Sequence, residues 1–88
     1  MGMIEKRVER FTESAVDDEI VIMRIDNGEF FAIGGTGLDI WPLIDGSRDR
    51  DALLATLEER YEAPAEVIAP DLDAFLSELV DAGLIRRS

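Results

Sequence analysis

The hydrophobic period of the chain changes once, near residue 35, and this change limits the possible folds more than any other feature. Before it, apolar residues alternate with polar ones or form short β-branched runs, which is typical of strands. After it, apolar residues recur every three or four positions, which is typical of amphipathic helices. This order predicts an α+β domain in which a small antiparallel sheet precedes a helical bundle.

The first part of the chain predicts three strands. Residues 7–11 alternate polar and apolar side chains and predict a half-buried strand, whereas the polar and acidic residues 12–18 predict a loop. Residues 19–25 are rich in β-branched side chains, and the Asp-Asn-Gly sequence at 26–28 predicts a hairpin that returns through a strand at 29–33. If the first strand pairs with residues 19–25, the return strand lies at the edge of the sheet.

The second part predicts three helices. Thr36 and Asp39 match a capping box, so the first helix is expected to begin there, with a kink at Pro42. Apolar spacing predicts a second helix over residues 49–61 and a third over residues 71–82, with Pro70 in its first turn and Gly83 as its C-cap. We therefore expect one domain over residues 1–88, with strands at about 7–33 and helices at about 36–82. The expected fold is a short three-stranded antiparallel sheet followed by a three-helix, winged helix-turn-helix-like bundle.

The charge of the chain argues against nucleic-acid binding, which that fold would otherwise suggest. Twenty acidic residues against nine basic ones give a net charge of −11. The candidate recognition helix and its approach, residues 66–81, carry five acids and no base, whereas phosphate contacts need cations. We also expect no contact with anionic membranes, and the short apolar runs and charged N-terminal segment predict a cytoplasmic protein without a signal peptide.

Catalytic and metal-binding chemistry have little support in the sequence. There is no Cys and no His, so thiolate nucleophiles, imidazole relays and Cys/His zinc sites are excluded. Asp71 and Asp73 lie about 200° apart on a helix and cannot share a metal ion. The glycine-rich segment at 34–37 lacks the lysine of a phosphate loop and is interpreted as a tight strand-to-helix turn. We expect no enzyme activity, no metal and no cofactor.

Binding is the remaining class of function, and the predicted edge strand is the candidate site. Phe30 and Phe31 lie on this strand with Glu29 as its only charged residue. An edge strand has unpaired backbone groups that can take up an extended peptide by strand addition. The alternative is that these aromatic side chains simply complete the core.

An ordered set of motifs from residue 19 onward resembles the PqqD-like peptide chaperones, also called RiPP recognition elements. The set comprises the aromatic pair Phe30-Phe31, the Thr36-Gly37-x-x-Ile40-Trp41 turn into a helix, Asp45-Gly46, and the segment "DLDAFLSELVDAGLI" at 71–85. The resemblance implies a non-catalytic protein that binds the leader segment of a ribosomally made precursor peptide. The implied leader-binding residues are Glu29, Phe30, Phe31, Ala32, Ile33, Asp71, Leu72, Phe75, Leu76 and Leu79.

The form of the Thr-Gly-x-x-Ile-Trp motif is most similar to the lasso-peptide type, whose implied partners are a leader peptidase and a macrolactam synthetase. Two alternatives stay open within the resemblance, a pyrroloquinoline-quinone chaperone and a partner of a radical enzyme. A further alternative from another class is a degenerate winged-helix module for protein interactions in transcription.

Overall fold

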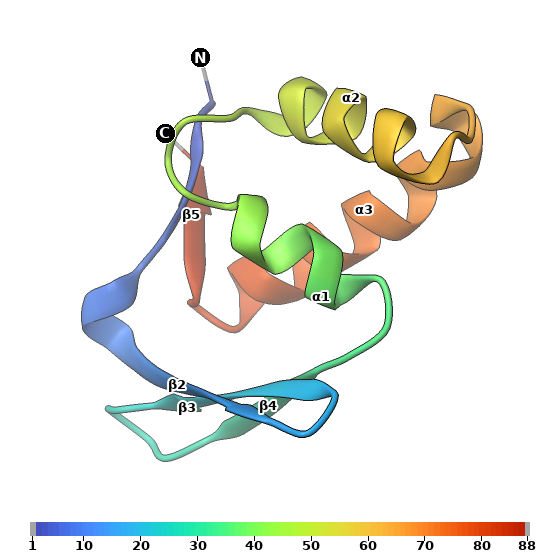
Figure 1. Ribbon diagram of the computed structural model, residues 1–88. Coiled ribbons are helices and arrows are strands. Elements are labelled where there is room, and N and C mark those ends of the chain that lie inside the picture. The colour runs from blue at the N-terminus through green and yellow to red at the C-terminus, as the bar shows by residue number, and fades with distance from the viewer. Residues whose placement is uncertain (1, 88) are drawn as a thin grey trace.

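The computed structural model describes residues 2–87 and arranges them in two layers (Figure 1). The lower layer is an antiparallel sheet in the order β2-β3-β4, formed by β2 (Phe11–Val16), β3 (Glu19–Arg24) and β4 (Phe30–Ile33). The upper layer contains α1 (Gly37–Ile40), which continues into the 3-10 helix η2 (Trp41–Leu43), and then α2 (Arg50–Tyr61) and α3 (Ala65–Asp81). The predicted α+β fold, with a three-stranded sheet followed by three helices, is confirmed.

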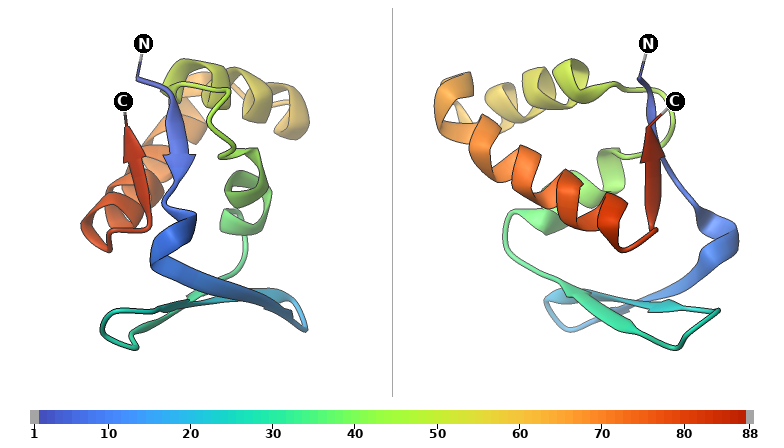
Figure 2. Two further views of the ribbon diagram at one scale, coloured as in Figure 1. Left: turned by 90° about the vertical axis from the view of Figure 1, so that its left-hand side faces the viewer. Right: turned by 180° about the vertical axis from the view of Figure 1, so that it is seen from behind.

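A second, two-stranded sheet joins the beginning of the described chain to its end. β1 (Ile4–Lys6) pairs antiparallel with β5 (Ile85–Arg87), beside the helical layer (Figure 2). The 3-10 helix η1 (Val8–Arg10) then leads from β1 into β2. The sequence did not predict this second sheet, because strands of three residues carry too short a pattern to be recognised.

The first predicted strand and loop are both wrong. Residues 8–10 form η1, and most of the expected loop at 12–18 is β2, which pairs with β3 from Phe11 opposite Arg24 to Val16 opposite Glu19. Every side chain of β2 after Phe11 is exposed, so this strand lacks the apolar alternation that identifies strands in a sequence. Pairing with β3 holds it in place.

The β3–β4 hairpin is confirmed, with a longer loop than a two-residue turn. Gly28 has the left-handed φ of 71° that an L-residue rarely adopts, and its N–H donates to the Arg24 carbonyl at 2.9 Å. The side chain of Asn27 accepts a hydrogen bond from the Glu29 N–H at 3.0 Å. The loop places β4 at the edge of the sheet, as expected.

The helix boundaries differ from the predicted ones in two places. Thr36 makes no side-chain cap, so the expected capping box is wrong; its own backbone is already helical. α3 begins at Ala65 rather than near residue 71 and contains Pro70 in its interior. The buried side chain of Ile68 explains the earlier start, since it extends the apolar face of α3 by one turn.

The second helix begins near residue 49 and the third ends before Gly83, as the sequence predicts; the N-cap residue of the second helix was not predicted. Asp49 caps α2 by accepting a hydrogen bond from the Ala52 N–H at 2.8 Å. Gly83 has a φ of 75° after α3, and the N–H of Leu84 donates to the carbonyl of Leu79 at 3.0 Å. This is a Schellman motif, which ends the helix and turns the chain into β5.

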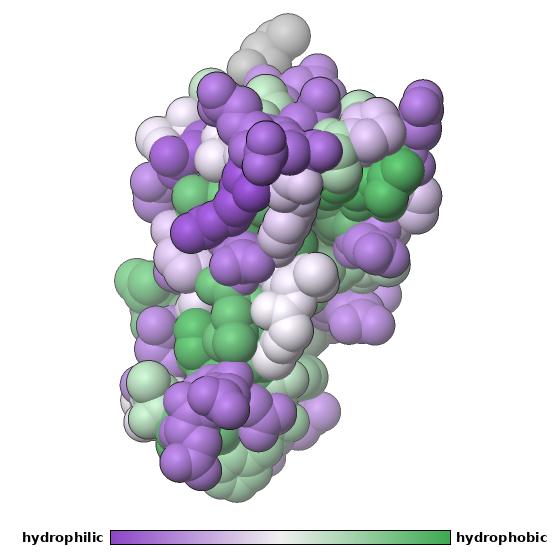
Figure 3. Space-filling model, turned by 45° about the vertical axis from the view of Figure 1, so that its right-hand side comes forward, coloured by the Kyte–Doolittle hydropathy of each residue, from purple (hydrophilic) through white to green (hydrophobic). Residues whose placement is uncertain are grey.

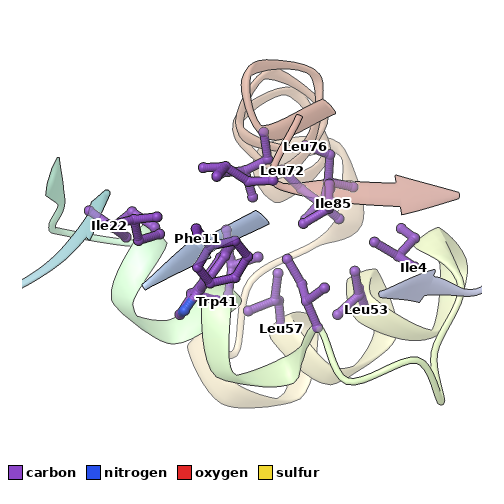
Figure 4. Close-up of a cluster of buried hydrophobic side chains, with 14 of the residues drawn as sticks. Ile4, Phe11, Ile22, Trp41, Leu53, Leu57, Leu72, Leu76 and Ile85 are labelled. Atoms are coloured by element: carbon purple, nitrogen blue, oxygen red, sulfur yellow. The ribbon is translucent and has the colours of Figure 1, made fainter. Parts of the chain in front are cut away.

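One hydrophobic core lies between the layers, and Trp41 is its largest fully buried side chain (Figure 4). Trp41 packs against Phe11 with ring centroids 5.7 Å apart, and its Nε1 donates to Glu13 Oε2 at 3.1 Å. The Lys6 ammonium lies 4.6 Å from the centroid of the same ring. Trp41 therefore connects β1 and β2 to the helical layer.

No helix within residues 2–87 is long and apolar enough to cross a lipid bilayer.

Candidate functional site

A groove of about 490 Å³ separates the open edge of β4 from the C-terminal half of α3. We call it the β4–α3 groove. On the sheet side, it is lined by Phe31 and Ile33, whose side chains point toward the helices. The helix side presents Phe75 and Leu79, one turn apart. Its complete lining is Arg24, Glu29, Phe31, Ala32, Ile33, Phe75, Glu78, Leu79, Asp81 and Ala82.

The backbone of β4 offers hydrogen-bonding groups at the mouth of this groove. The Arg24 N–H donates to the Glu29 carbonyl at 2.9 Å, and the register continues with Ile22 opposite Phe31. Antiparallel strands alternate between hydrogen-bonded and non-hydrogen-bonded pairs. The main-chain groups of Phe31 therefore point toward β3, whereas those of Phe30 and Ala32 point toward the open edge.

The two ends of the β4–α3 groove differ in polarity. Ile33 and Phe75 form an apolar end, which begins at the turn into α1. Gly37 makes this close packing possible, since a Cβ on it would lie only 2.8 Å from Ile33 Cγ2 and 3.1 Å from Phe75 Cε1. The opposite end carries three carboxylates and one guanidinium, contributed by Glu29, Glu78, Asp81 and Arg24.

Arg24 closes the charged end of the groove. Its Nη2 donates to Asp26 Oδ2 at 2.5 Å, and its guanidinium lies against Gly83, within 3.5–3.7 Å of where a Cβ on that glycine would stand. The Arg24 side chain is only 16% exposed, and its Nε is buried without a partner among the described residues. Burial is the largest single influence on Asp26 and raises its pKa, but the hydrogen bond and charge of Arg24, together with backbone hydrogen bonds, outweigh it, so the pKa lies below its ordinary value.

The structure brings six of the ten predicted site residues into the groove. They are Glu29, Phe31, Ala32, Ile33, Phe75 and Leu79. The Phe30 side chain does not line it; it is 69% exposed and points to the other face of the sheet, as alternation along a strand requires.

The other three predicted residues lie elsewhere on α3. Leu72 and Leu76 are fully buried and belong to the core (Figure 4). Asp71 lines a separate cavity of about 180 Å³ between α1, α2 and α3, where Leu72 also reaches the wall. On the face shown in Figure 3, hydrophobic side chains come to the surface between the sheet layer and the helical layer.

Four lining residues were missed by the sequence prediction, and two had a recognisable signal. Glu78 and Ala82 follow Phe75 at i+3 and i+7, so they share one helix face with it. Arg24 and Asp81 had no such signal. Arg24 reaches the groove because the hairpin pairs it with Glu29, which a linear pattern does not reveal.

Within residues 2–87, no cluster of three or more Asp or Glu side chains is placed to hold a metal ion. The strongest perturbation of a titratable side chain lies outside the groove. Burial, and then the hydrogen bond that its hydroxyl donates to Asp39, raise the pKa of Tyr61 to about 12.

The β4–α3 groove combines an open strand edge, apolar walls and fixed charges. This combination is suited to holding an extended peptide.

Comparisons with known proteins find one family model and one solved structure that are similar to this chain. The family model of "Coenzyme PQQ synthesis protein D (PqqD)" matches residues 19–85. A solved structure described as "TbiB1 in Complex with the TbiA(beta) Leader Peptide" is similar with a TM-score of 0.76 and 22% identity, over 88% of this chain and 90% of that one. This likeness establishes the fold. A comparison with curated proteins found no significant match.

Proposed function

The chain belongs to the PqqD family, and from this premise we propose that it binds the leader segment of a ribosomally made precursor peptide without catalysing a reaction. The leader adds to the sheet as a fourth strand beside β4 and fills the β4–α3 groove. The observation that carries the proposal is the coincidence of the open edge at Phe30 and Ala32 with apolar walls from Phe31, Ile33 and Phe75. The similar fold of a protein described in complex with a leader peptide supports it.

In the proposed complex, the backbone of β4 and the side chains of the groove contribute differently to leader binding. Main-chain hydrogen bonds to Phe30 and Ala32 give affinity that does not depend on sequence, whereas the walls select alternate side chains of the bound strand. An apolar leader side chain fits beside Phe75, and a basic one fits near Glu29 and Glu78. Strand pairing and apolar contacts are weakly screened by salt, so affinity should change little between low and high ionic strength.

The binding site is tested with a synthetic leader segment of a precursor peptide whose processing requires this protein, titrated calorimetrically into the purified protein. Phe31→Asp should abolish binding, because it places a charge in the apolar wall. Phe30→Asp is the matched control, since its side chain lies on the other face, and it should retain the affinity of the natural protein. Equal affinities for the two variants would overturn the groove as the leader site.

A backbone variant separates strand addition from side-chain contact. Ala32→Pro removes an N–H that points to the open edge, and proline is tolerated on edge strands. We expect it to weaken leader binding at least about fivefold through the loss of one hydrogen bond, whereas Ala32→Ser should not. Circular dichroism shows whether each variant is folded. Full affinity of folded Ala32→Pro would contradict strand addition beside β4.

We propose lasso-peptide biosynthesis as the setting, with a leader peptidase and a macrolactam synthetase as cytoplasmic partners. The similarity of the Thr36-Gly37-x-x-Ile40-Trp41 segment to the lasso type supports this choice over a pyrroloquinoline-quinone or radical-enzyme chaperone. The purified protein alone should leave its precursor intact in mass spectrometry and should accelerate cleavage by the peptidase. Cleavage without the peptidase would contradict the non-catalytic role.

A further inference from the structure

A second strand edge lies beside α3, on the side of the helix away from β4. A groove of about 470 Å³ lies here, and we call it the β5–α3 groove. It is lined by the three residues of β5, by Ser77, Val80 and Asp81 of α3, and by Arg7. At 100° per residue, Ser77 and Val80 lie nearly opposite Phe75, Glu78 and Ala82 on the helix, whereas Asp81 lies between these two faces and lines both grooves. The two grooves therefore lie on either side of one helix, one beside β4 and the other beside β5, and Asp81 is common to both.

The backbone of β5 is paired on one side. The Arg7 N–H donates to the Leu84 carbonyl at 2.8 Å, and these residues continue the β1–β5 register. By the alternation of antiparallel pairs, Arg86 also exchanges hydrogen bonds with β1, whereas the main-chain groups of Ile85 and Arg87 point the other way.

The neighbours of β1 support this assignment independently. Ile4 lies opposite Arg87, and its own main chain bonds away from β5. Its N–H donates to the Arg48 carbonyl at 2.9 Å, and its carbonyl accepts from the Gly46 N–H at 3.0 Å. The pair of Ile4 and Arg87 is therefore not hydrogen-bonded across the ladder. Ile85 is only 2% exposed, so among the described residues of β5 it is Arg87 whose outward main-chain groups reach the surface.

The β5–α3 groove is rich in arginine although the chain is strongly acidic. Arg7, Arg86 and Arg87 line it, against Asp81 as the acid of the lining. The Arg86 Nε donates to Glu5 at 2.5 Å, and Arg7 lies 3.8 Å from Glu9. A guanidinium has five N–H donors, so one ion pair leaves most of them available. The Nε of Arg7, the atom 3.8 Å from Glu9, is buried and makes no hydrogen bond among the described residues.

We propose that the β5–α3 groove binds an acidic, extended segment of a partner protein. The segment pairs with the main chain of Arg87, its carboxylates bond to the arginines, and an apolar side chain covers Val80, which is 41% exposed. Charge complementarity selects this occupant, because planar guanidinium groups bind carboxylates with paired hydrogen bonds. This site goes beyond the proposed leader site, and both grooves can be filled at once because Asp81 is the single residue that lines both of them.

Two blocked synthetic peptides test this proposal, one with the sequence Glu-Val-Glu-Val-Glu and one with Lys-Val-Lys-Val-Lys. Each is titrated into the ¹⁵N-labelled protein at low salt. We expect the glutamate peptide to shift the amide resonances of Ile85, Arg87 and Val80 with saturation, and to leave those of Phe30 and Ala32 unchanged. The lysine peptide should not shift the β5 resonances.

Charge variants show which arginines carry the binding. Arg87→Glu should weaken binding of the glutamate peptide by about tenfold or more through loss of charge-assisted hydrogen bonds, and Arg87→Gln by less. Arg60→Glu on α2 is the matched control and should have little effect, since Arg60 lies outside the groove. The amide spectrum shows whether each variant is folded. If the charge reversal in Arg87→Glu unfolds β5, the milder Arg87→Gln still tests the site.

Three results would overturn the site. The first is that the glutamate peptide causes no saturable amide shift at about 1 mM. The second is that amide shifts are spread equally over all surface arginines. The third is that Arg60→Glu and Arg87→Gln lose equal affinity for the glutamate peptide. The readout is separate from that of leader binding, which concerns Phe30 and Ala32. Either proposal can therefore fail without affecting the test of the other, because the two are followed at different amide resonances.

Discussion

Gly37→Ala is the substitution that most directly tests how the turn into α1 shapes the β4–α3 groove. The added Cβ would stand 2.8 Å from Ile33 Cγ2 and 3.1 and 3.3 Å from two ring carbons of Phe75. Since carbon atoms pack best at about 3.5–4.0 Å, the Ile33 methyl must move by at least about 0.7 Å. Both displaced side chains line the groove, so the change should affect stability and peptide binding together.

The expected cost follows from two opposing effects. Forcing an extra methyl group into a packed core typically costs about 1–3 kcal/mol. Replacing glycine by alanine restricts the unfolded chain and returns about 0.4–1 kcal/mol. We therefore expect Gly37→Ala to lower the free energy of unfolding by about 1–2 kcal/mol, which for a domain of this size lowers Tm by at least about 4 °C. Leader affinity should fall as well.

Gly34→Ala provides the matched control. A Cβ on Gly34 would lie 3.6 Å from Glu19 Oε2, which is an ordinary contact, and this glycine has no positive φ. It should be neutral or slightly stabilising and should leave leader binding unchanged. Urea unfolding followed by the fluorescence of the single tryptophan, Trp41, measures both variants. Equal stability and equal leader affinity of the two variants would refute the argument from close packing.

Three other predictions concern stability and pH. Asp49→Ala should lower the free energy of unfolding by about 1 kcal/mol in urea, because α2 loses its N-cap acceptor. The hydrogen bonds from Arg50 lower the pKa of Asp73, so this ion pair stabilises the fold above about pH 4 and is lost as the pH falls. In Asp73→Asn, the free energy of unfolding should therefore decrease less steeply on acidification than in the natural protein. Tyr61 should titrate near pH 12 by ultraviolet absorbance, and Asp39→Asn should move that midpoint toward 10.

The sequence predicted the helical layer better than the sheets. Trp41, Leu53 and Leu57 were expected on buried faces and are buried, since helical periodicity directly reports which face meets the core. Thr12 to Val16 form a strand despite exposed side chains, because pairing with β3 stabilises them, and such non-local pairing leaves no local pattern. β5 was missed for the same reason, since its partner lies at the other end of the chain.

The candidate site could be predicted in part because its two walls have different origins. The β4 wall follows from the hairpin and from strand alternation, both of which are local, although alternation also turns the Phe30 side chain away. The α3 wall depends on the rotation of the helix about its axis. Leu72 and Leu76 face the core and Phe75 and Glu78 face the groove, a distinction that apolar spacing alone does not make.

The open edge of β4 has a consequence for how copies of this protein behave in solution. Two such edges could pair with each other, and exposed apolar edges are common starting points of aggregation. The net charge of −11 opposes this encounter, because two copies repel each other at neutral pH. Near pH 4, where the carboxylates become protonated, that repulsion is lost. The acidity of the chain thus opposes association of two copies through the open edge of β4 at neutral pH.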